Sequence, residues 1–235
     1  MKSTIAQIRE RFDKDVERFS NLETGQSATI DAPLALELIT DAAAAICPSA
    51  TDLLDIGCGA GNYTLKTLSK IPNLNCTLVD LSAPMLVRAK ERVSGATRGT
   101  IITHQSDIRE LELSNAKYDI VVAAAVLHHL RGDEDWELVF AKIFRALKPG
   151  GSFWISDLII HDNKAVHAAM WKRYGQYLSS LKDEAYRDHV FNYIDYEDTP
   201  RSLNYQIELL RKVGFAEVEI LHKNSVFAAF GGIKS

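Results

Sequence analysis

Three glycines at alternate positions, Gly57, Gly59 and Gly61, follow a short apolar run and precede a helical pattern. Glycine accepts positive φ and lets a ligand come close to the backbone. The free N–H groups at the start of the following helix favour polar or anionic ligand groups. Asp80 ends the next apolar run, 19 residues after Gly61, and a carboxylate there suits the two hydroxyls of a ribose. The pattern predicts a strand, a tight turn and a helix that bind a nucleoside-containing ligand.

The spacing of the glycines separates two classes of ligand. The dinucleotide fingerprint is G-x-G-x-x-G/A, and counted from Gly57 its third small residue would fall at Asn62, which does not fit. The observed G-x-G-x-G after Asp55 instead resembles motif I of the class I S-adenosylmethionine-dependent methyltransferases. Further segments resemble that family in the expected order, namely 79–82 with Met85, 106–108, 118–121 through 127–130, and 147–151. The resemblance is close over about residues 50 to 160.

This resemblance implies S-adenosylmethionine as the cofactor and S-adenosylhomocysteine as its product. The glycine loop, in which Cys58 is a small filling residue, packs against the methionine and ribose portion. Asp55 orients the loop or meets the amino group, and Asp80 holds the ribose hydroxyls. The backbone around Ala124 approaches the amino acid end. From the residues alone, Asp80 could instead cap the next helix.

The adenine end of the cofactor is assigned by the same resemblance. Leu81 and Met85 flank the ring, Asp107 accepts from its exocyclic amine, and Ile108 lies beside it. Met85 could instead be a core residue, and Asp107 could close a turn. These alternatives stay open at the level of the sequence.

Two adjacent histidines, His128 and His129, follow the fourth predicted strand. Histidine titrates near neutral pH and can accept a proton. Neighbouring side chains leave a strand on different sides, so at most one should face the substrate. We favour His129 as a substrate-side residue or general base. A structural histidine bonded to backbone is the alternative, and a thiol, amine or enol acceptor would need no base.

Two segments should shape the acceptor pocket, namely residues 3–30 and the aromatic stretch 162–196. The first carries Ile5, Ile8, Phe12, Val16 and Phe19 on one helical stripe, and Phe19 is a candidate acceptor contact. In the second, the spacing of three places three aromatic side chains on one helical face, Trp171, Tyr174 and Tyr177. They either pack that helix onto the sheet or enclose a small acceptor and exclude water.

Strands and helices alternate between these segments, which favours a parallel sheet covered on both faces. Strands are expected at 53–57, 76–81, 100–104, 118–126 and 151–159, and helices at 62–70, 84–93 and 134–147. Asp31 and Pro33 predict the start of an earlier helix that runs to about Ile46. A final helix over 201–213 ends at Gly214 and leads into a hairpin of 216–222 and 225–233.

The expected fold class is therefore α/β: a Rossmann-like, doubly wound, seven-stranded sheet, mostly parallel with a C-terminal antiparallel hairpin, plus a helical cap. Residues 1–235 form a single methyltransferase domain. It divides into an N-terminal cap (1–32), a cofactor-binding core (33–160), a helical and aromatic cap insertion (161–200), and the closing helix and hairpin (201–235).

Composition and charge limit the class of protein and its partners. The 235 residues are 46% hydrophobic and 25% charged, as in ordinary globular proteins, and the net charge of −4 carries no footprint of bulk nucleic-acid binding. No apolar run approaches the ~20 residues that span a bilayer. Three cysteines lack metal-ligand spacing, so no metal is expected. We expect a cytoplasmic monomer or homodimer without a membrane partner, acting on a small molecule.

Two other functions stay open. Residues 210–215 and 225–234 also resemble a narrower group, the bacterial carboxy-S-adenosylmethionine synthases and tRNA-wobble-uridine-modification proteins. That group holds the extra carboxylate of carboxy-S-adenosylmethionine with an arginine before the last helix, and Arg201 lies in the corresponding region. The third possibility is a non-catalytic, cofactor-binding regulatory subunit, because intact glycines and acidic residues say nothing about turnover.

Overall fold

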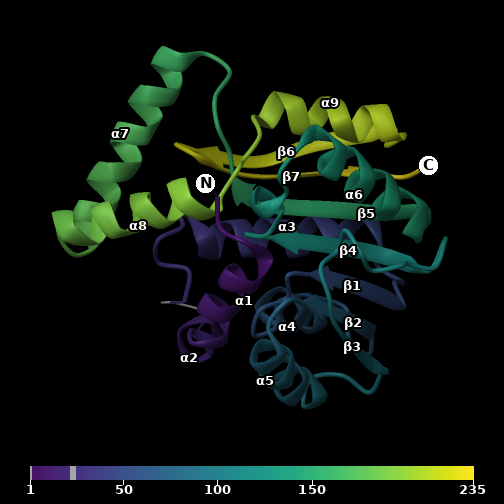
Figure 1. Cartoon of the computed structure of the whole chain (residues 1–235). Coiled ribbons are helices and arrows are strands. Elements are labelled where there is room, and N and C mark those ends of the chain that lie inside the picture. The colour runs from purple at the N-terminus through teal and green to yellow at the C-terminus, as the bar shows by residue number, and fades with distance from the viewer. Residues whose placement is uncertain (1, 22–24) are drawn as a thin grey trace.

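A seven-stranded sheet forms the centre of the computed structural model, which describes residues 2–21 and 25–235 (Figure 1). The strand order is β3-β2-β1-β4-β5-β7-β6. Strands β1 to β5 run parallel to one another, whereas β7 is antiparallel to both β5 and β6. The strands are β1 Asp52–Ile56, β2 Asn75–Asp80, β3 Ile101–Gln105, β4 Tyr118–Ala124, β5 Leu147–Leu158, β6 Glu217–Asn224 and β7 Phe227–Ile233. The predicted mostly parallel sheet with a closing hairpin is confirmed.

Helices cover both faces of this sheet. On one face lie α3 Ala32–Ile46, α4 Asn62–Lys70 and α5 Ala83–Ser94, and on the other α6 Asp133–Ala146 and α9 Leu203–Val213. Neighbouring residues of a strand face opposite layers: Leu53 packs with the α3 side and Leu54 with the α6 side. This period of two explains why the central strands are apolar throughout, since both faces are buried.

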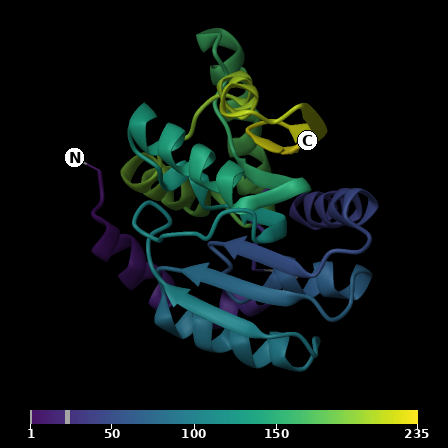
Figure 2. The same cartoon turned by 90° about the vertical axis from the view of Figure 1, so that its right-hand side faces the viewer.

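The remaining helices form the cap at one end of the sheet. They are α1 Ile5–Asp13, α2 Val16–Ser20, α7 Lys164–Leu181 and α8 Glu184–Glu197. In Figure 1 they lie on the side toward which the arrows of the parallel strands point, and Figure 2 shows the purple N-terminal helices beside the arrowheads of the blue strands. Ligands of open α/β sheets bind at this carboxyl edge.

The cap has a small apolar core of its own. Tyr174 and Leu178 of α7 are buried with Val190 of α8, and they pack against Leu158 and Val226 at the end of the sheet. This cluster is separate from the two large cores beside the sheet. Helices α7 and α8 are therefore held to the end of the sheet by apolar contacts of their own.

The single helical stripe predicted over residues 3–20 is wrong in one respect, because the chain turns at Lys14 and Asp15 and forms two helices. The turn brings the rings of Phe12 and Phe19 to a centroid separation of 5.6 Å. Seven residues of straight helix would separate them by about 10.5 Å along the axis. The break therefore lets both rings face the same place.

Two further predictions of local structure need correction. Asp31 stands at the start of α3 but makes no side-chain cap, because its backbone is left-handed with φ 57°. Its carboxylate instead accepts from Asn224 at 2.8 Å, which ties α3 to the closing hairpin. Strand β5 begins at Leu147 rather than at residue 151, since residues 148–151 form an irregularity in its pairing with β4.

Within the described ranges, the longest helices are too short or too polar to cross a membrane.

Candidate active site

The glycine loop has the conformation that its sequence predicts. Gly57, Gly59 and Gly61 all have positive φ, at 66°, 49° and 83°. A side-chain carbon on Gly57 would come within 2.6 Å of Val126, whereas one on Gly59 would meet no atom within 4 Å. Gly57 is therefore required by packing, while Gly59 borders open space. That open space is the first of two cavities.

The glycine-loop cavity, as we call this first space, has a volume of about 720 Å³ including the part open to solvent. It brings together most of the residues predicted to hold the cofactor, namely Asp55, Gly57, Cys58, Gly59, Asp80, Leu81, Met85 and Ala124. Gly61 lies outside its wall, where it lets α4 pack closely on Val93 and Ala89 of α5. Asp107 and Ile108 line a recess that adjoins the cavity through Gly57, Asp80 and Leu81.

Two carboxylates fix the loop, of which Asp55 is buried and Asp80 is partly buried. Asp55 accepts a hydrogen bond from the hydroxyl of Thr64 at 2.6 Å, and burial raises the pKa of Asp55 to about 6. Asp80 accepts from the backbone N–H groups of Gly59 at 2.8 Å and Ser82 at 2.9 Å, and burial raises its pKa as well. Both carboxylates therefore orient the strand–turn–helix unit. The capping role considered for Asp80 falls to Ser82, whose hydroxyl accepts from the N–H of Met85.

The recess at Asp107 is held by cations. Arg109 donates to both oxygens of Asp107, at 3.0 and 2.6 Å, and also reaches Asp135. Burial alone would raise the pKa of Asp107, but Arg109 outweighs it and lowers the pKa. Lys142 of α6 donates to the carbonyls of Ile108, Arg109 and Leu111. Lys142 thus fixes the loop after β3 to α6.

A second space, the cap cavity, lies between the sheet edge and the cap and has a volume of about 800 Å³ including its open part. Its wall is largely aromatic and carries a few polar side chains, which include Arg11, Arg18, His128, Asp157 and Asp198. The two cavities share wall residues, namely Phe12, Phe19, Gln26, Tyr63, Ala124 and Ala125. A ligand in one cavity therefore adjoins a ligand in the other.

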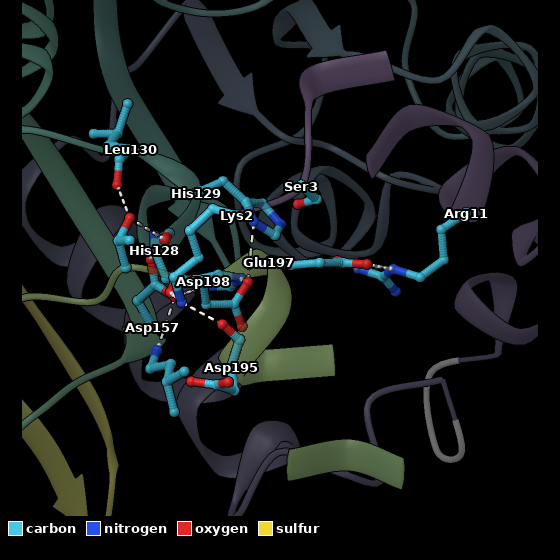
Figure 3. A network of polar contacts seen from close by, with 12 residues as sticks. Lys2, Ser3, Arg11, His128, His129, Leu130, Asp157, Asp195, Glu197 and Asp198 are labelled. Atoms are coloured by element: carbon cyan, nitrogen blue, oxygen red, sulfur yellow. Dashed lines mark hydrogen bonds and ion pairs between the residues drawn. The ribbon is translucent and has the colours of Figure 1, made fainter. Parts of the chain in front are cut away.

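A cluster of histidine and carboxylate side chains stands where the two cavities meet (Figure 3). Nδ1 of His128 is bonded to Oδ1 of Asp157, whose other oxygen accepts from the His128 N–H at 3.1 Å. Oδ1 of Asp198 lies 3.7 Å from Nε2 of His128 and 3.1 Å from Nδ1 of His129. Asp157 and Asp198 are both buried. His128, Asp157 and Asp198 line the cap cavity, and His129 lines the glycine-loop cavity.

The charges of this cluster follow from burial and from the carboxylates. Burial alone would lower the pKa of His128, but Asp157 and Asp198 outweigh it and raise the pKa to about 9. Burial lowers the pKa of His129, and the neighbouring His128 lowers it further. Burial would raise the pKa of Asp198, but the two histidines hold it below its ordinary value. The two adjacent imidazoles thus differ in charge at neutral pH.

Three separate parts of the chain build the cluster. The histidines stand in the short 3₁₀ turn η1, Leu127–His129, which follows β4. Asp157 is the penultimate residue of β5, and Asp198 follows the last residue of α8. The backbone N–H of Thr199 donates to the carbonyl of His128 at 2.7 Å. The end of the cap is thereby joined directly to the histidine turn.

The structure places the predicted acceptor residues unevenly. Phe19 lines both cavities and Tyr174 lines the cap cavity. Trp171 stacks on Phe191 with ring centroids 4.7 Å apart, and Tyr177 donates to the carbonyl of Ser27 at 2.8 Å. Neither lines either of the two cavities, and both make packing contacts within the cap.

Two polar candidates lie outside the wall of the cap cavity. Arg201 donates to Asp133 at 2.6 Å and to the carbonyl of Arg131, and it lines neither cavity. His129, which we favoured for the substrate side, lines the glycine-loop cavity, whereas His128 lines the cap cavity. The 3₁₀ turn explains the exchange, because it ends the alternation that a strand would have continued.

Sequence reasoning missed several residues of the cap cavity. Asp157 was detectable, because it lies near the carboxyl end of an apolar strand, as Asp80 does. Asp198 carries no such signal, since it stands in a polar stretch after a helix. Tyr193 is one of many aromatic residues in the segment 162–196, and nothing in the sequence distinguishes it from the others.

Comparisons with known proteins agree with this geometry. Residues 53–151 match the model of the methyltransferase domain family. The carboxy-S-adenosyl-L-methionine synthase of Shewanella amazonensis is 30% identical over 193 residues, which cover 78% of this chain and 76% of that protein.

Solved structures share the fold at low identity. Human N-acetylserotonin methyltransferase in complex with S-adenosylmethionine has a TM-score of 0.63 at 17% identity, over 98% of this chain and 58% of that one. An O-methyltransferase family protein from Burkholderia thailandensis has a TM-score of 0.65 at 15% identity, over 98% of this chain and 60% of that one. This chain thus spans about three fifths of either structure. By the family match and the synthase relative, the chain belongs to the class I S-adenosylmethionine-dependent methyltransferases, with S-adenosylmethionine as its cofactor.

Proposed function

We propose that this protein transfers the methyl group of S-adenosylmethionine to a small molecule bound in the cap cavity. The observation that carries the proposal is the shared wall of the two cavities, formed among others by Phe12, Phe19 and Ala124. Because the glycine-loop cavity adjoins the cap cavity there, an acceptor can lie next to a bound cofactor. Holding two reactants in this way supplies much of what a transfer reaction requires.

The residues of the glycine-loop cavity suit the cofactor. A side chain on Gly59 would project into open space, so the glycine keeps that space available for a ligand. A carboxylate offers about four acceptor positions, so Asp80 can bind hydroxyls in addition to its two backbone donors. We assign the ribose to Asp80 and the adenine to Leu81, Met85, Asp107 and Ile108.

The amino acid end of the cofactor belongs at the other side of the loop. We assign it to Cys58 and the backbone of Ala124, near Asp55. Asp55 acts through the loop, because its carboxylate is engaged by the hydroxyl of Thr64. Gly61 contributes by letting α4 approach α5 closely.

When bound, S-adenosylmethionine supplies a methyl group that its sulfonium has already activated for in-line displacement. The protein therefore has to align the acceptor and to keep water away. The aromatic side chains of Phe12, Phe19 and Tyr63 at the shared wall can do both. His128, Asp157 and Asp198 present the polar atoms of the cap cavity to the acceptor, so we assign to His128 the acceptor-facing role first expected of His129.

The acceptor should be a small, partly aromatic or apolar molecule with at least one polar group. The largely aromatic wall of the cap cavity and its few polar side chains suit such a molecule, because small-molecule sites are mostly apolar with a small number of placed polar groups. Tyr174 and Tyr193 provide flat apolar surface, while Arg11 and Arg18 stand at the outer side. A bulk macromolecule would not fit beneath the cap.

Carboxy-S-adenosylmethionine synthesis or use, linked to tRNA modification, is the second candidate. The synthase from Shewanella amazonensis favours it, at 30% identity. Arg201, however, is engaged with Asp133 outside both cavities. We therefore favour the unmodified cofactor. Native mass spectrometry of the purified protein separates the two, because the carboxylated cofactor is heavier by the mass of carbon dioxide.

The decisive experiment is a screen of small hydroxyl, thiol and amine acceptors that measures release of S-adenosylhomocysteine. At least one class should give release above the background without acceptor. Phe19→Ala should reduce this release by widening the shared wall, and Ile102→Ala on the far edge strand should leave it unchanged. A protein that binds S-adenosylmethionine yet methylates no member of a broad panel would instead support a regulatory subunit.

A further inference from the structure

We propose that His128, His129 and Asp198 form a binding site for one divalent transition-metal ion, where the glycine-loop cavity meets the cap cavity. One donor atom from each side chain lies within 4.8 Å of the other two. Figure 3 shows the three side chains converging from the histidine turn and from the end of α8. The spacing of the cysteines predicted no metal site. The histidine and aspartate donors give no signal in the sequence, because residues 129 and 198 are far apart along the chain.

The spacing of the donor atoms suits a metal. Oδ1 of Asp198 lies 3.1 Å from Nδ1 of His129 and 3.7 Å from Nε2 of His128. Zinc bound at about 2.0–2.1 Å in a tetrahedral site separates neighbouring ligand atoms by about 3.4 Å. The two observed separations lie on either side of that value. The separation between the two histidine donor atoms is within 4.8 Å, so the three groups lie close enough for one ion to draw them together.

A second observation is that the donor atoms of His129 and Asp198 are buried and, although they form an ion pair 3.1 Å apart, make no well-aligned hydrogen bond. Neither ring nitrogen of His129 nor Oδ1 of Asp198 has a hydrogen-bond partner in the described part of the chain. The side chains are only 14% and 3% exposed. Buried polar atoms are nearly always satisfied, and those that are not require an explanation. A metal ion would satisfy Asp198 Oδ1 and one nitrogen of His129 at once.

The third ligand is already oriented for coordination. His128 shares its Nδ1 with Asp157, whose side chain is fully buried and also accepts from the N–H groups of His128 and Leu158. This leaves Nε2 directed toward Asp198. Metal-binding histidines almost always donate their other ring nitrogen to a carboxylate or carbonyl in this way. A metal would displace the proton that Nε2 otherwise carries.

The donor set indicates the kind of metal. Two imidazoles and one carboxylate suit zinc, iron, cobalt or nickel better than calcium or magnesium, which prefer oxygen ligands. Three protein ligands leave at least one coordination position open. Because His128 and Asp198 line the cap cavity, the open position faces the acceptor. If the function proposed above holds, the metal would bind an acceptor hydroxyl and lower its pKa.

Metal binding can be measured without any acceptor. The full chain, stripped with a chelator and dialysed, is titrated with Zn²⁺ by calorimetry and with Co²⁺ by visible absorption. We expect one ion per chain. Asp157→Asn should weaken binding about 10–100-fold, and His129→Ala and Asp198→Ala should weaken it further. His167→Ala is the matched control, because His167 also carries a buried Nδ1 without a partner but stands beside His161, away from the cluster.

The outcomes separate the metal site from the proposed function. Three results would each overturn the site. The parent protein could bind no metal, His129→Ala and Asp198→Ala could bind it as tightly as the parent, or only His167→Ala could lose binding. Calorimetry with S-adenosylhomocysteine checks that each variant is folded. If Asp198→Ala loosens the cap, the result for His129→Ala decides whether the metal site exists. A stripped protein that binds the product and transfers methyl groups, yet takes no metal, contradicts only the site. A protein that binds metal but transfers no methyl group contradicts only the function.

Discussion

The backbone N–H of Gly59 donates to Oδ2 of Asp80 at 2.8 Å, so the carboxylate is held by the same loop whose ligand it faces. The other oxygen of Asp80 accepts from Ser82, at the start of α5. A single partly buried side chain thereby joins two parallel strand–helix units beside the glycine-loop cavity. The arrangement makes cofactor affinity sensitive to both residues of the pair.

Replacing Asp80 should weaken binding of S-adenosylhomocysteine without unfolding the protein. A hydrogen bond to a charged group is worth about 1.5–3 kcal/mol, so Asp80→Ala should raise the Kd more than tenfold. Isothermal titration calorimetry measures this. Asp52→Ala is the control, since Asp52 pairs with Lys148 at the opposite end of β1. Unchanged affinity in a folded Asp80→Ala protein would place the ribose elsewhere.

A side chain at Gly59 should abolish cofactor binding. Valine resists the φ of 49° and would project into the open space of the cavity. Gly132→Val is the matched control, because a side chain there also meets no atom within 4 Å but the φ is −91°. Calorimetry should detect binding in the control alone. Normal binding by a folded Gly59→Val protein would show that the loop is not the contact.

Asp55 should make the protein less stable as the pH rises. Its pKa in the folded state, about 6, lies above the ordinary 3.8, so the folded state favours the protonated form. The stability from this preference is complete below 3.8 and is lost as the pH passes 6. The difference corresponds to about 3 kcal/mol, at ~1.36 kcal/mol per pKa unit. Asp55→Asn, which resembles the protonated form, should gain up to this amount at about pH 8 and nothing near pH 4.

Urea denaturation at several pH values tests this sign. Asp119→Asn provides a control of opposite direction. Burial alone would raise the pKa of Asp119, but Lys148 and backbone donors lower it. Its stabilising effect is therefore present at neutral pH and lost on acidification, so Asp119→Asn should be less stable than the parent at about pH 8. Parallel pH curves for parent and Asp55→Asn would contradict the raised pKa of Asp55.

The cap should become more protected from hydrogen exchange when S-adenosylhomocysteine binds. Phe12 and Phe19 of the N-terminal helices line the glycine-loop cavity directly, and ordering of a cap is coupled to its ligand. Peptides from α1, α2 and the ends of α7 and α8 should exchange more slowly, while β6 at the far edge should not change. Protection confined to 53–61, 78–86 and 105–109 would make the cap segments ordinary packing elements.

The fold could be predicted because its signals are local. The apolar run of β4, the glycine loop and Gly214 at the end of α9 each specify their own element, and the predicted bounds of α4 agree with the observed ones. The break between α1 and α2 was harder to predict from the sequence. Nothing in the pattern Ile8, Phe12 indicates a turn at Lys14, because the two helices are separated by packing of Phe12 on Phe19 rather than by a glycine or proline.

The candidate site divides in the same way. The cofactor residues lie close to motifs at strand ends, so a resemblance could assign them. The cap cavity depends on contacts between distant segments. Asp198 reaches the histidines only because α8 ends against the turn after β4. Trp171 and Tyr177 share the helical face of Tyr174, but only Tyr174 reaches the cavity, since α8 and the segment before α3 cover the others.

The chain's first described residues contact the end of α8. Lys2 donates to the carbonyl of Asp198 at 2.6 Å, and the N–H of Ser3 donates to that of Tyr196 at 3.0 Å. The walls of the cap cavity thus come from peripheral helices, while its floor comes from the sheet edge that also serves the cofactor. Such a division lets the wall residues diverge independently of the floor. Grafting α7 and α8, which contribute no residue to the glycine-loop cavity, from a relative onto this sheet is therefore a route to new acceptor selectivity with the cofactor affinity retained.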